Sequence, residues 1–437
     1  MNDTRSTPEF NEAHYTRSVM ELSDILTVTT SKPIFSKSGL KLVGEDTEIN
    51  SAFFKRMLEH TMTPPFEQCL VAADGITHEE LVQQAQQLLQ HDIKLARMAK
   101  FIGKSELLLQ PLRKVVLAPS VHFLLTLARE RRPAMLEHGL HVALVSIYLG
   151  LRAGQSPSQL VQLATAGLLH DLGELRFNPQ LFDSNFRLSR EERAQIQQHV
   201  EMSHRILKNA GAYTAAVLDA VLQHHERMDR SGYPTGLAGE AISRAGQIVA
   251  AAEMAGSKVC QGMWGAVRLE MICKLNAQQF EPQLLSFLSV LYGQRNTAAT
   301  GRQKPSRVGA EEVHGELNKI ALIFNTWSEL SGKLQSKPNS TFNFIQQRLA
   351  DLNVALQDAG VNLKGKQFLV DSMEQDDQAM IELGQLNLEV IWQLRELMLV
   401  VQRRWPRYEI DASLHGQAVN AWIDSMEELL GASGRLF

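Results

Sequence analysis

The chain has 437 residues, of which 44% are apolar and 21% charged, and its net charge is only −4. These values are ordinary for a globular protein, and the length favours two or three domains over a single core. The weak net charge excludes a broad basic surface, so neither DNA nor an anionic membrane is expected as a partner.

The cysteines and the start of the chain indicate a reducing compartment. Cys69, Cys260 and Cys273 are odd in number and far apart, which argues against a disulfide framework. The polar N-terminus lacks the apolar segment of a signal peptide, and no window approaches the roughly 18 apolar residues of a membrane span. We therefore expect a soluble cytoplasmic protein with no membrane span.

Residues 1–110 are predicted to form a small α+β domain, in which residues 1–30 are a mobile lead-in. Two short apolar runs, at 34–35 and 40–43, flank a Gly turn and predict a hairpin. Thr77 and Glu80 have the spacing of a capping box, which predicts the start of an amphipathic helix.

The middle of the chain, residues 111–295, has a helical pattern almost throughout. A second capping box, Ser189 to Glu192, predicts one helix that continues to Leu207. Residues 296–309 are rich in Gly, Pro, Ser and Thr and are predicted to be a linker.

Residues 310–437 are again predicted to be helical. A heptad-like stripe is formed by Ile345, Leu349, Leu352 and Leu356, and a second apolar run from 381 to 405 ends before Pro406. These helices can form an intramolecular bundle, or they can offer a surface for a homodimer or a protein partner. The sequence leaves both open.

Histidines are concentrated in one part of the chain. Seven of the 14 lie within residues 138–225: His138, His141, His170, His199, His204, His224 and His225. Taken singly, His138, His141 and His204 are typical of surface histidines. Clustering on successive predicted helices instead indicates a metal site, because neutral imidazole is a common ligand of first-row metals.

A two-metal hydrolase needs ligands from separate elements and one carboxylate that bridges both ions. The candidates come about one per predicted helix: His138, then His170 and Asp171, then His199, then His224 and His225. Asp171 is the natural bridging carboxylate. The adjacent pair at 224–225 can serve two metals, or one metal where the backbone bends at a helix end.

Three motifs occur in order: His170-Asp171, then His224-His225-Glu226, then Gly232-Tyr233-Pro234. This order resembles the HD-GYP family, bacterial metal-dependent phosphodiesterases that open the second messenger cyclic di-GMP. The resemblance covers roughly residues 138–256 and implies a mainly α fold with a central helical HD-type bundle. It implies two divalent ions, with Fe or Mn favoured, and the ligand set His138, His170, Asp171, His199, His224, His225 and Glu253.

The resemblance also implies the chemistry. A metal-bridging hydroxide is expected to attack phosphorus in line, and Asp229 or a metal-bound water to assist the leaving oxygen. Gly232 and Tyr233 are expected to hold a base of the substrate, and Arg230 is a candidate cation for its phosphate. The substrate is expected to be cyclic di-GMP or a related nucleotide.

Several positions depart from the family pattern. Glu253 stands where the family has a ligand aspartate, and it can be a ligand or a solvated helix residue. Glu174 replaces a lysine that faces the substrate phosphate, and Gly262 stands near the place of a phosphate-binding arginine. Two alternatives to a working phosphodiesterase therefore stay open: a catalytically weakened signalling or interaction module, and a phosphohydrolase for another nucleotide.

Overall fold

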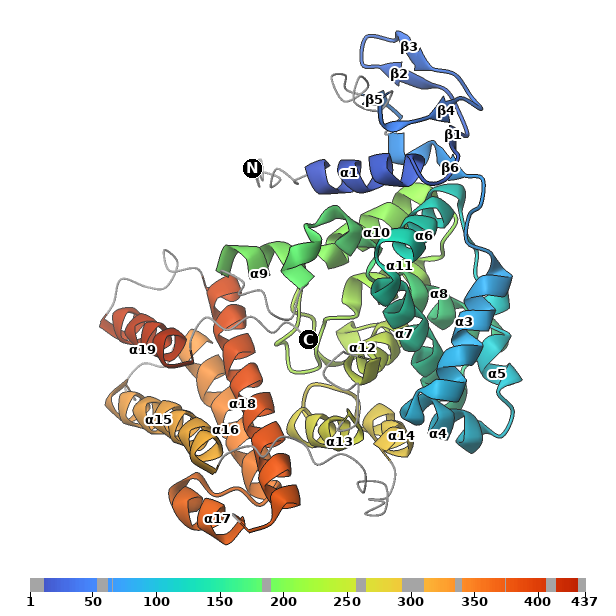
Figure 1. The fold of residues 1–437 in the computed structure, drawn as a ribbon. Coiled ribbons are helices and arrows are strands. Elements are labelled where there is room, and N and C mark those ends of the chain that lie inside the picture. The colour runs from blue at the N-terminus through green and yellow to red at the C-terminus, as the bar shows by residue number, and fades with distance from the viewer. Residues whose placement is uncertain are drawn as a thin grey trace. The chain divides into compact units, whose positions relative to one another are not determined.

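The computed structural model describes residues 12–52, 62–64, 66–182, 190–256, 265–292, 310–334, 340–373, 375–405 and 414–430. The described chain is mainly helical, with two small antiparallel sheets near the N-terminus, as the sequence predicts (Figure 1). It divides into two compact units. The first contains the chain up to Arg227 and resumes at Tyr233, and the second contains Met228–Gly232 and the helices after residue 258.

The elements of the first unit include eleven described helices and six described strands. The helices are α1 (Glu12–Ser23), α3 (His78–His91), α4 (Ile93–Ile102), α5 (Glu106–Leu109), α6 (Pro119–Arg131), α7 (Pro133–Arg152), α8 (Pro157–Leu169), α9 (Arg190–Gln197), α10 (His199–Ala210), α11 (Ala215–Gln223) and α12 (Arg244–Gly256). The strands are β1 (Val28–Thr30), β2 (Ile34–Ser36), β3 (Lys41–Val43), β4 (Glu48–Ile49), β5 (Met62–Thr63) and β6 (Leu70–Ala72).

The strands form two three-stranded sheets, in the orders β4-β1-β6 and β3-β2-β5. In the second sheet, β2 pairs antiparallel with β3, and Ile34 lies opposite Val43. This pairing confirms the hairpin predicted from the two apolar runs around the Gly turn.

The expectation of a mobile lead-in is wrong for residues 12–30, which form α1 and β1. Tyr15, Val19 and Leu22 are fully or almost fully buried on one face of α1, which packs against α6. Their spacing of four and three residues is that of an amphipathic helix, a pattern obscured by the polar residues around it. Residues 1–11 lie outside the described chain.

The first capping box is confirmed, and the long helix after the second is not. The Thr77 hydroxyl accepts the Glu80 amide at 3.1 Å, while the Thr77 amide donates to the Glu80 carboxylate at 2.7 Å. The predicted helix to Leu207 is instead two helices, α9 and α10. At the break between them, the carbonyl of Ile196 accepts a hydrogen bond from Nδ1 of His199 at 2.7 Å. Ser189, the first residue of the predicted capping box, lies outside the described residues.

Two glycines allow α7 and α8 to cross at close range. A Cβ on Gly167 would lie 2.7 Å from the Cα of Ala143, and one on Gly139 would lie 2.7 Å from the carbonyl oxygen of Leu168. Both contacts are shorter than packed side chains permit, so the crossing requires glycine at these places. The crossing brings His138, next to Gly139, close to the end of α8.

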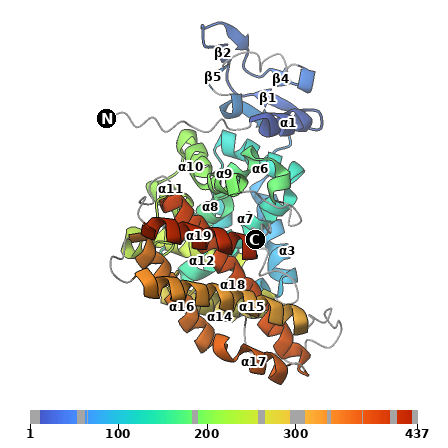
Figure 2. The same ribbon diagram turned by 90° about the vertical axis from the view of Figure 1, so that its left-hand side faces the viewer.

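The second unit contains the helices α13 (Gly265–Leu275), α14 (Pro282–Tyr292), α15 (Ala310–Leu334), α16 (Ser340–Asp358), α17 (Lys366–Met373), α18 (Asp377–Arg404) and α19 (Leu414–Leu430). The helices α15, α16, α18 and α19 lie together in Figure 1 and Figure 2. The predicted stripe of α16, from Ile345 to Leu356, is buried in one apolar cluster with residues of α15, α18 and α19. The helices therefore pack on one another within the chain, and a further partner surface stays a prediction.

The predicted domain boundaries at 110, 295 and 309 remain predictions, because a compact unit need not fold on its own. The predicted linker, 296–309, lies outside the described residues, as do Cys260 and Gly262. Cys69 and Cys273 are free and buried.

One described helix, α7, is long and apolar enough to cross a membrane by length and composition, which corrects the prediction that no window approaches a membrane span. However, 72% of its apolar window is buried inside the protein, as is typical of a core helix.

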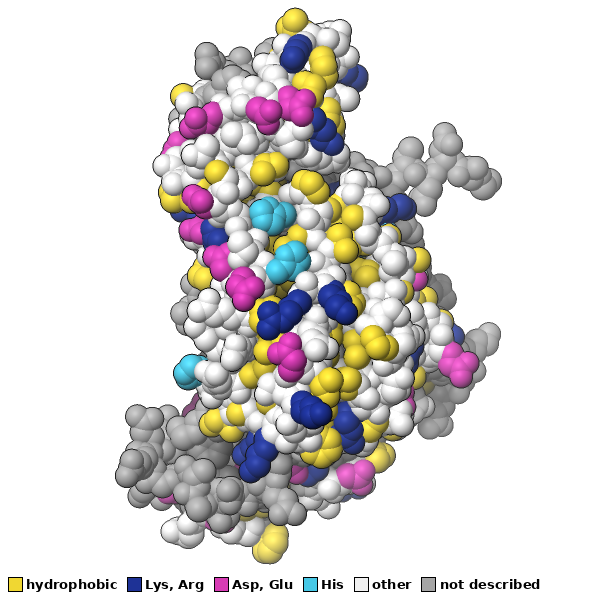
Figure 3. All heavy atoms as spheres, turned by 90° about the vertical axis from the view of Figure 1, so that its right-hand side faces the viewer, with side chains coloured by type: hydrophobic (Ala, Val, Ile, Leu, Met, Phe, Trp, Pro, Cys, Tyr) yellow, Lys and Arg dark blue, Asp and Glu magenta, His cyan; other side chains and the backbone are white. Residues whose placement is uncertain are grey.

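On the face drawn in Figure 3, the described basic and acidic side chains are interspersed.

Candidate metal centre

The seven predicted ligands lie on two helices and at several helix ends of the first unit. His138 lies on α7, His170 directly follows α8, and Asp171 precedes a short 3₁₀ helix, η3 (Leu172–Arg176). His199 is the first residue of α10, and His224 directly follows α11. His225 is next to it, and Glu253 lies on α12. The backbone thus leaves the helix at the histidine pair, and the roles of the pair as ligands of one metal or of two stay predictions.

The first half of the site is formed by two histidines and two carboxylates. The Nε2 atoms of His138 and His170 lie 2.9 and 3.0 Å from Oε2 of Glu253. Oδ2 of Asp171 lies 3.0 Å from Nε2 of His170 and 3.7 Å from Nε2 of His138. Glu253 is only 7% exposed, so it is a buried member of the cluster and not a solvated helix residue.

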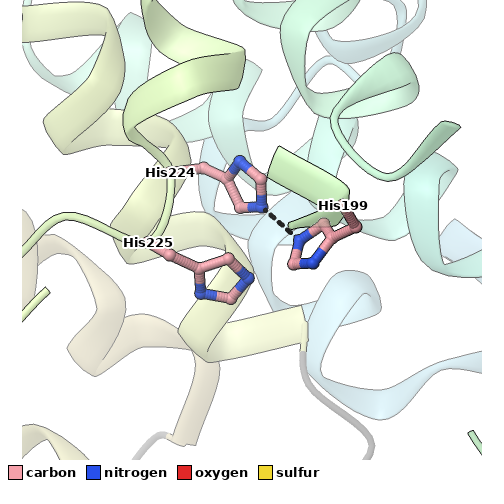
Figure 4. A group of neighbouring side chains, drawn as sticks. All are labelled: His199, His224 and His225. Carbon is pink, nitrogen blue, oxygen red and sulfur yellow. Dashed lines mark hydrogen bonds between the residues drawn. The ribbon is translucent and has the colours of Figure 1, made fainter. Parts of the chain in front are cut away.

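The second half is a group of three buried histidines, His199, His224 and His225, shown in Figure 4. The Nε2 atoms of His199 and His224 are 3.3 Å apart. The rings of His224 and His225 are also close, with centroids separated by 4.3 Å. Three imidazoles within this small volume form a candidate nitrogen-rich metal site.

Asp171 links the two halves through its two carboxylate oxygens. Oδ2 faces His138 and His170, whereas Oδ1 lies 3.2 Å from Nε2 of His199 and 3.6 Å from Nε2 of His224. This is the position required of a carboxylate that bridges two ions.

Three of the candidate ligand rings are oriented by the backbone turn that precedes them. The Nδ1 atoms of His170, His199 and His224 bond the carbonyl oxygens three residues earlier, at 2.8, 2.7 and 2.6 Å. A carbonyl accepts only from a protonated nitrogen, so these bonds place a proton on Nδ1 and direct Nε2 into the cluster.

The histidines of the site differ in their protonation. Burial disfavours a charged imidazole at His170 and at His199, but Asp171 outweighs it, so the pKa of His170 lies well above its ordinary value and the pKa of His199 is also raised. In the second half, burial lowers the pKa of His224 to about 4, and burial with the neighbouring His224 holds the pKa of His225 well below its usual value. These two imidazoles are therefore neutral, the form that binds metal.

The donor set fits divalent metal ions. Among the described residues, the buried Nε2 of His170 and Oδ1 of Asp171 have no hydrogen-bond partner of acceptable geometry, although several donors and acceptors lie near them. Buried polar atoms are rarely left unpaired. A bound Fe, Mn or Zn ion would satisfy both atoms, because imidazole nitrogens and carboxylate oxygens are common ligands of these metals. The roles of the residues as ligands remain predictions.

A further glycine positions η3 against α10. A Cβ on Gly173 would lie 2.3 Å from the carbonyl oxygen of His199. The amide of Gly173 donates to the Ser203 hydroxyl at 2.8 Å. This approach holds Asp171, two residues before Gly173, beside His199.

Glu174, the residue in place of the family's lysine, is paired with an arginine. Arg132 donates to the Glu174 carboxylate at 2.9 Å and to its carbonyl at 3.0 Å. Both side chains are less than a fifth exposed. Burial and the nearby Asp171 raise the pKa of Glu174. The negative charge of Glu174 is therefore offset locally, which the sequence could not show because Arg132 is 42 residues away.

Tyr233 lies against the second histidine group. Its ring stacks on that of His225, with centroids 4.7 Å apart and planes inclined by 16°, and its amide donates to the His225 carbonyl at 3.1 Å. Glu226, a residue without an assigned role in the sequence reading, accepts the amides of Thr235, Gly236 and Leu237 at 2.7, 3.0 and 2.9 Å. It anchors the loop that follows Tyr233.

The remaining predicted residues, Asp229, Arg230 and Gly232, belong to the second unit. Asp229 forms an ion pair with Arg348 and accepts the amide of Ser231 at 2.9 Å. Arg230 has a left-handed backbone with φ of 68°, and the Gly232 carbonyl accepts a bond from Arg403 at 2.8 Å. Their roles in substrate binding and catalysis stay predictions.

Two buried histidine groups that share an aspartate provide the kind of donor set that a metal-dependent phosphohydrolase needs. Residues 122–264 match a family model described as HD domain, so the central part of this chain is an HD domain.

Curated relatives agree with this family. A cyclic di-GMP phosphodiesterase of Pseudomonas aeruginosa, PA4108, is 29% identical over 185 residues, which is 41% of this chain and 44% of that protein. The 3′3′-cGAMP-specific phosphodiesterase 2 of Vibrio cholerae is 29% identical over 35% of this chain and 31% of its own length. The cyclic di-GMP phosphodiesterase response regulator RpfG of Xanthomonas campestris is 34% identical over 28% and 32%. The matches thus span less than half of each relative.

A solved structure of an HDG"Y"P protein from Bdellovibrio bacteriovorus, Bd1817, matches 61% of this chain and 95% of its own, with 14% identity and a TM-score of 0.35. The resemblance to the HD-GYP family is confirmed at the level of the HD domain and its distant phosphodiesterase homologues.

Proposed function

We propose that the protein is a metal-dependent phosphodiesterase that hydrolyses cyclic di-GMP or a closely related cyclic dinucleotide such as 3′3′-cGAMP. The proposal depends above all on Asp171, whose two oxygens face different histidine groups. It is supported by relatives that carry these two activities in their names. A cytoplasmic location belongs to the same proposal.

The residues of the chain prepare the site in three ways. Backbone carbonyls fix the rings of His170, His199 and His224, so the metal-binding nitrogens need no reorientation. Asp171 and Glu253 supply negative charge to offset bound cations. Divalent ions held there would supply Lewis-acid charge for the phosphoryl oxygens and lower the pKa of water.

The substrate contacts proposed for this chain lie in the segment after the histidine pair. Tyr233 offers an aromatic ring for stacking a guanine, and its position is fixed by contact with His225. Gly232 leaves room for a close approach of the ligand. Arg230 is the proposed phosphate cation, and Asp229 the proposed acid for the leaving oxygen.

A second candidate, a weakened module that binds nucleotide without efficient turnover, is favoured by one observation. The place of the family's lysine holds Glu174, and its pairing with Arg132 uses a cation that could otherwise bind phosphate. A charge-assisted bond to phosphate contributes about 1.5–3 kcal/mol, so this replacement weakens substrate binding more than it weakens the metal centre.

The test combines metal analysis with hydrolysis under anaerobic conditions. Purified protein is loaded with Mn²⁺ or Fe²⁺, and its metal content is measured beside the hydrolysis of cyclic di-GMP and of 3′3′-cGAMP. Two ions per chain with linear dinucleotide as product are expected. Two ions without either product would favour the weakened module or another nucleotide.

The matched variants are Asp171→Ala and Asp219→Ala. Asp219 is an exposed aspartate on α11, so its loss should change neither metal content nor rate. Asp171→Ala should lose both, because the shared oxygens are removed. Full metal content in Asp171→Ala would refute the assignment of the bridging residue.

A further inference from the structure

A buried polar cluster lies on α4 and α7, beside the metal centre. Lys94 of α4 is only 4% exposed, and His141 of α7 only 3%. The expectation of a surface histidine is therefore wrong for His141. Its Nε2 lies 3.9 Å from Oδ2 of Asp92, and among the described residues neither ring nitrogen has a hydrogen-bond partner.

Asp92 fixes the start of α4 and so the place of Lys94. Its Oδ1 accepts the backbone amides of Lys94 and Leu95 at 2.8 and 2.9 Å, as an N-cap residue does. The side chain of Lys94 then extends to α12, where its ammonium donates to the carbonyl of Ala255 at 3.3 Å. The bond joins residues 161 positions apart in the sequence.

A buried ammonium requires compensation, because a charge removed from water is costly unless it is paired or bonded. The carbonyl end of a helix attracts a cation, since the helix dipole is negative there. The bond from Lys94 to the end of α12 is therefore favourable, and it is made while that end stays against α4. The contact couples the position of α12 to that of α4.

The end of α12 also packs tightly on the helix that carries the first histidine. A Cβ on Gly256 would lie 3.1 Å from Nδ1 of His141 and 3.8 Å from Cε1 of His138. Burial and then Lys94 lower the pKa of His141 to about 3, so its ring is neutral. Glu253, two residues before Ala255, occupies the same end of α12.

These contacts reach only one half of the centre. Glu253 faces His138 and His170, whereas His199, His224 and His225 lie at the ends of α10 and α11. α12 also packs on α11, but it does so near its N-terminal end, where a Cβ on Gly246 would lie 2.7 Å from Oε1 of Gln223. A displacement of the C-terminal end of α12 would therefore move the Glu253 carboxylate away from the first half and affect the three-histidine group less.

We propose that Lys94 is a positioning residue for the Glu253 half of the metal centre, so that α4, which precedes the matched HD domain at 122–264, forms part of the site. This inference rests on the metal centre of the proposed function but not on its substrate. Through Lys94, the N-terminal segment would influence the binding of one of the two ions.

The experiment is a titration of the full-length apoprotein with Mn²⁺, in which free Mn²⁺ is followed by electron paramagnetic resonance. Lys94→Met should weaken one of two binding steps by about 10–100-fold, as loss of a supporting contact typically does, and leave the other step unchanged. Lys94→Arg, which keeps a cationic donor, should restore most of the lost affinity. Lys100→Met removes an exposed lysine from the same helix and should match the parent protein.

The outcomes separate the two proposals. A parent protein that binds no Mn²⁺ would overturn the metal centre and the inference with it. Two binding steps in the parent with both unchanged in Lys94→Met, or both weakened equally, would overturn the inference alone. If Lys94→Met does not fold, Lys94→Gln, whose polar side chain is uncharged and too short to replace the bond to Ala255, is titrated instead and carries the same expectations.

Discussion

Glu226 provides the sharpest test of how the site is built, because it directly follows the histidine pair but bonds backbone amides and is not one of the predicted ligands. Its carboxylate accepts three backbone amides of the loop at residues 235–237, and the residue is only 1% exposed. We expect Glu226→Gln to release this loop while the metal content stays at the parent value.

The magnitude follows from the three bonds. Oε1 accepts two amides and Oε2 accepts one, so the glutamine keeps one acceptor and turns an N–H₂ toward the amide of Leu237. One charged bond is lost and two become neutral, and a charged bond contributes about 1.5–3 kcal/mol against about 0.5–1.5 for a neutral one. Because the loop is partly exposed and its amides can regain water, we expect a loss of about 2–3 kcal/mol in the free energy of unfolding.

The assay has a global and a local readout. Urea denaturation gives the change in free energy of unfolding, and hydrogen exchange reports the amides of Thr235, Gly236 and Leu237 directly. Glu201→Gln, an exposed change on α10, is the matched control. Unchanged exchange at the three amides together with parent stability would refute the anchoring role, and loss of metal would make Glu226 part of the ligand set.

Three further predictions concern pairs seen in the structure. Glu174→Lys should lower the melting temperature because it places a second cation beside Arg132, and the reversed pair Arg132→Glu with Glu174→Lys should recover it and raise cyclic di-GMP turnover; no recovery would contradict the pairing. Tyr233→Phe should retain the affinity for cyclic dinucleotide and Tyr233→Ala should lose about 1–3 kcal/mol of it, measured by calorimetry, because only the ring stacks; equal affinities would exclude a stacking role. Asp229→Asn and Arg348→Gln should cost similar stability, with a coupling energy of about 1–3 kcal/mol in a double-mutant cycle, and a fall in turnover specific to Asp229→Asn would support its role as an acid.

The motif residues could be predicted because the residues of each motif are neighbours in the sequence. His170 and Asp171 are adjacent, as are His224 and His225, so each pair needs only a helix end to reach the centre. The hairpin and the capping box at Thr77 are also local patterns. The apolar stripe of α1, formed by Tyr15, Val19 and Leu22, is also a local pattern. The sequence does not make it evident, because these three apolar residues stand among polar ones.

The supporting residues could not be predicted, because their roles depend on partners far away in the sequence. Arg132 gains its role from Glu174, and Lys94 gains its role from Ala255. A lysine in an amphipathic helix is normally solvated, and nothing near residue 94 indicates burial. Only the packing of α4 against α7 and α12 makes it a buried donor.

The replacement of aspartate by Glu253 also becomes understandable from packing. A glutamate reaches one methylene further than an aspartate. Oε2 of Glu253 nevertheless lies within 3.0 Å of both His138 and His170. The small residues Ala255 and Gly256 let the end of α12 pack on α7, and Lys94 bonds that end from the other side. We therefore expect the position of the longer Glu253 side chain to depend on the buried contacts that hold the end of α12 in place.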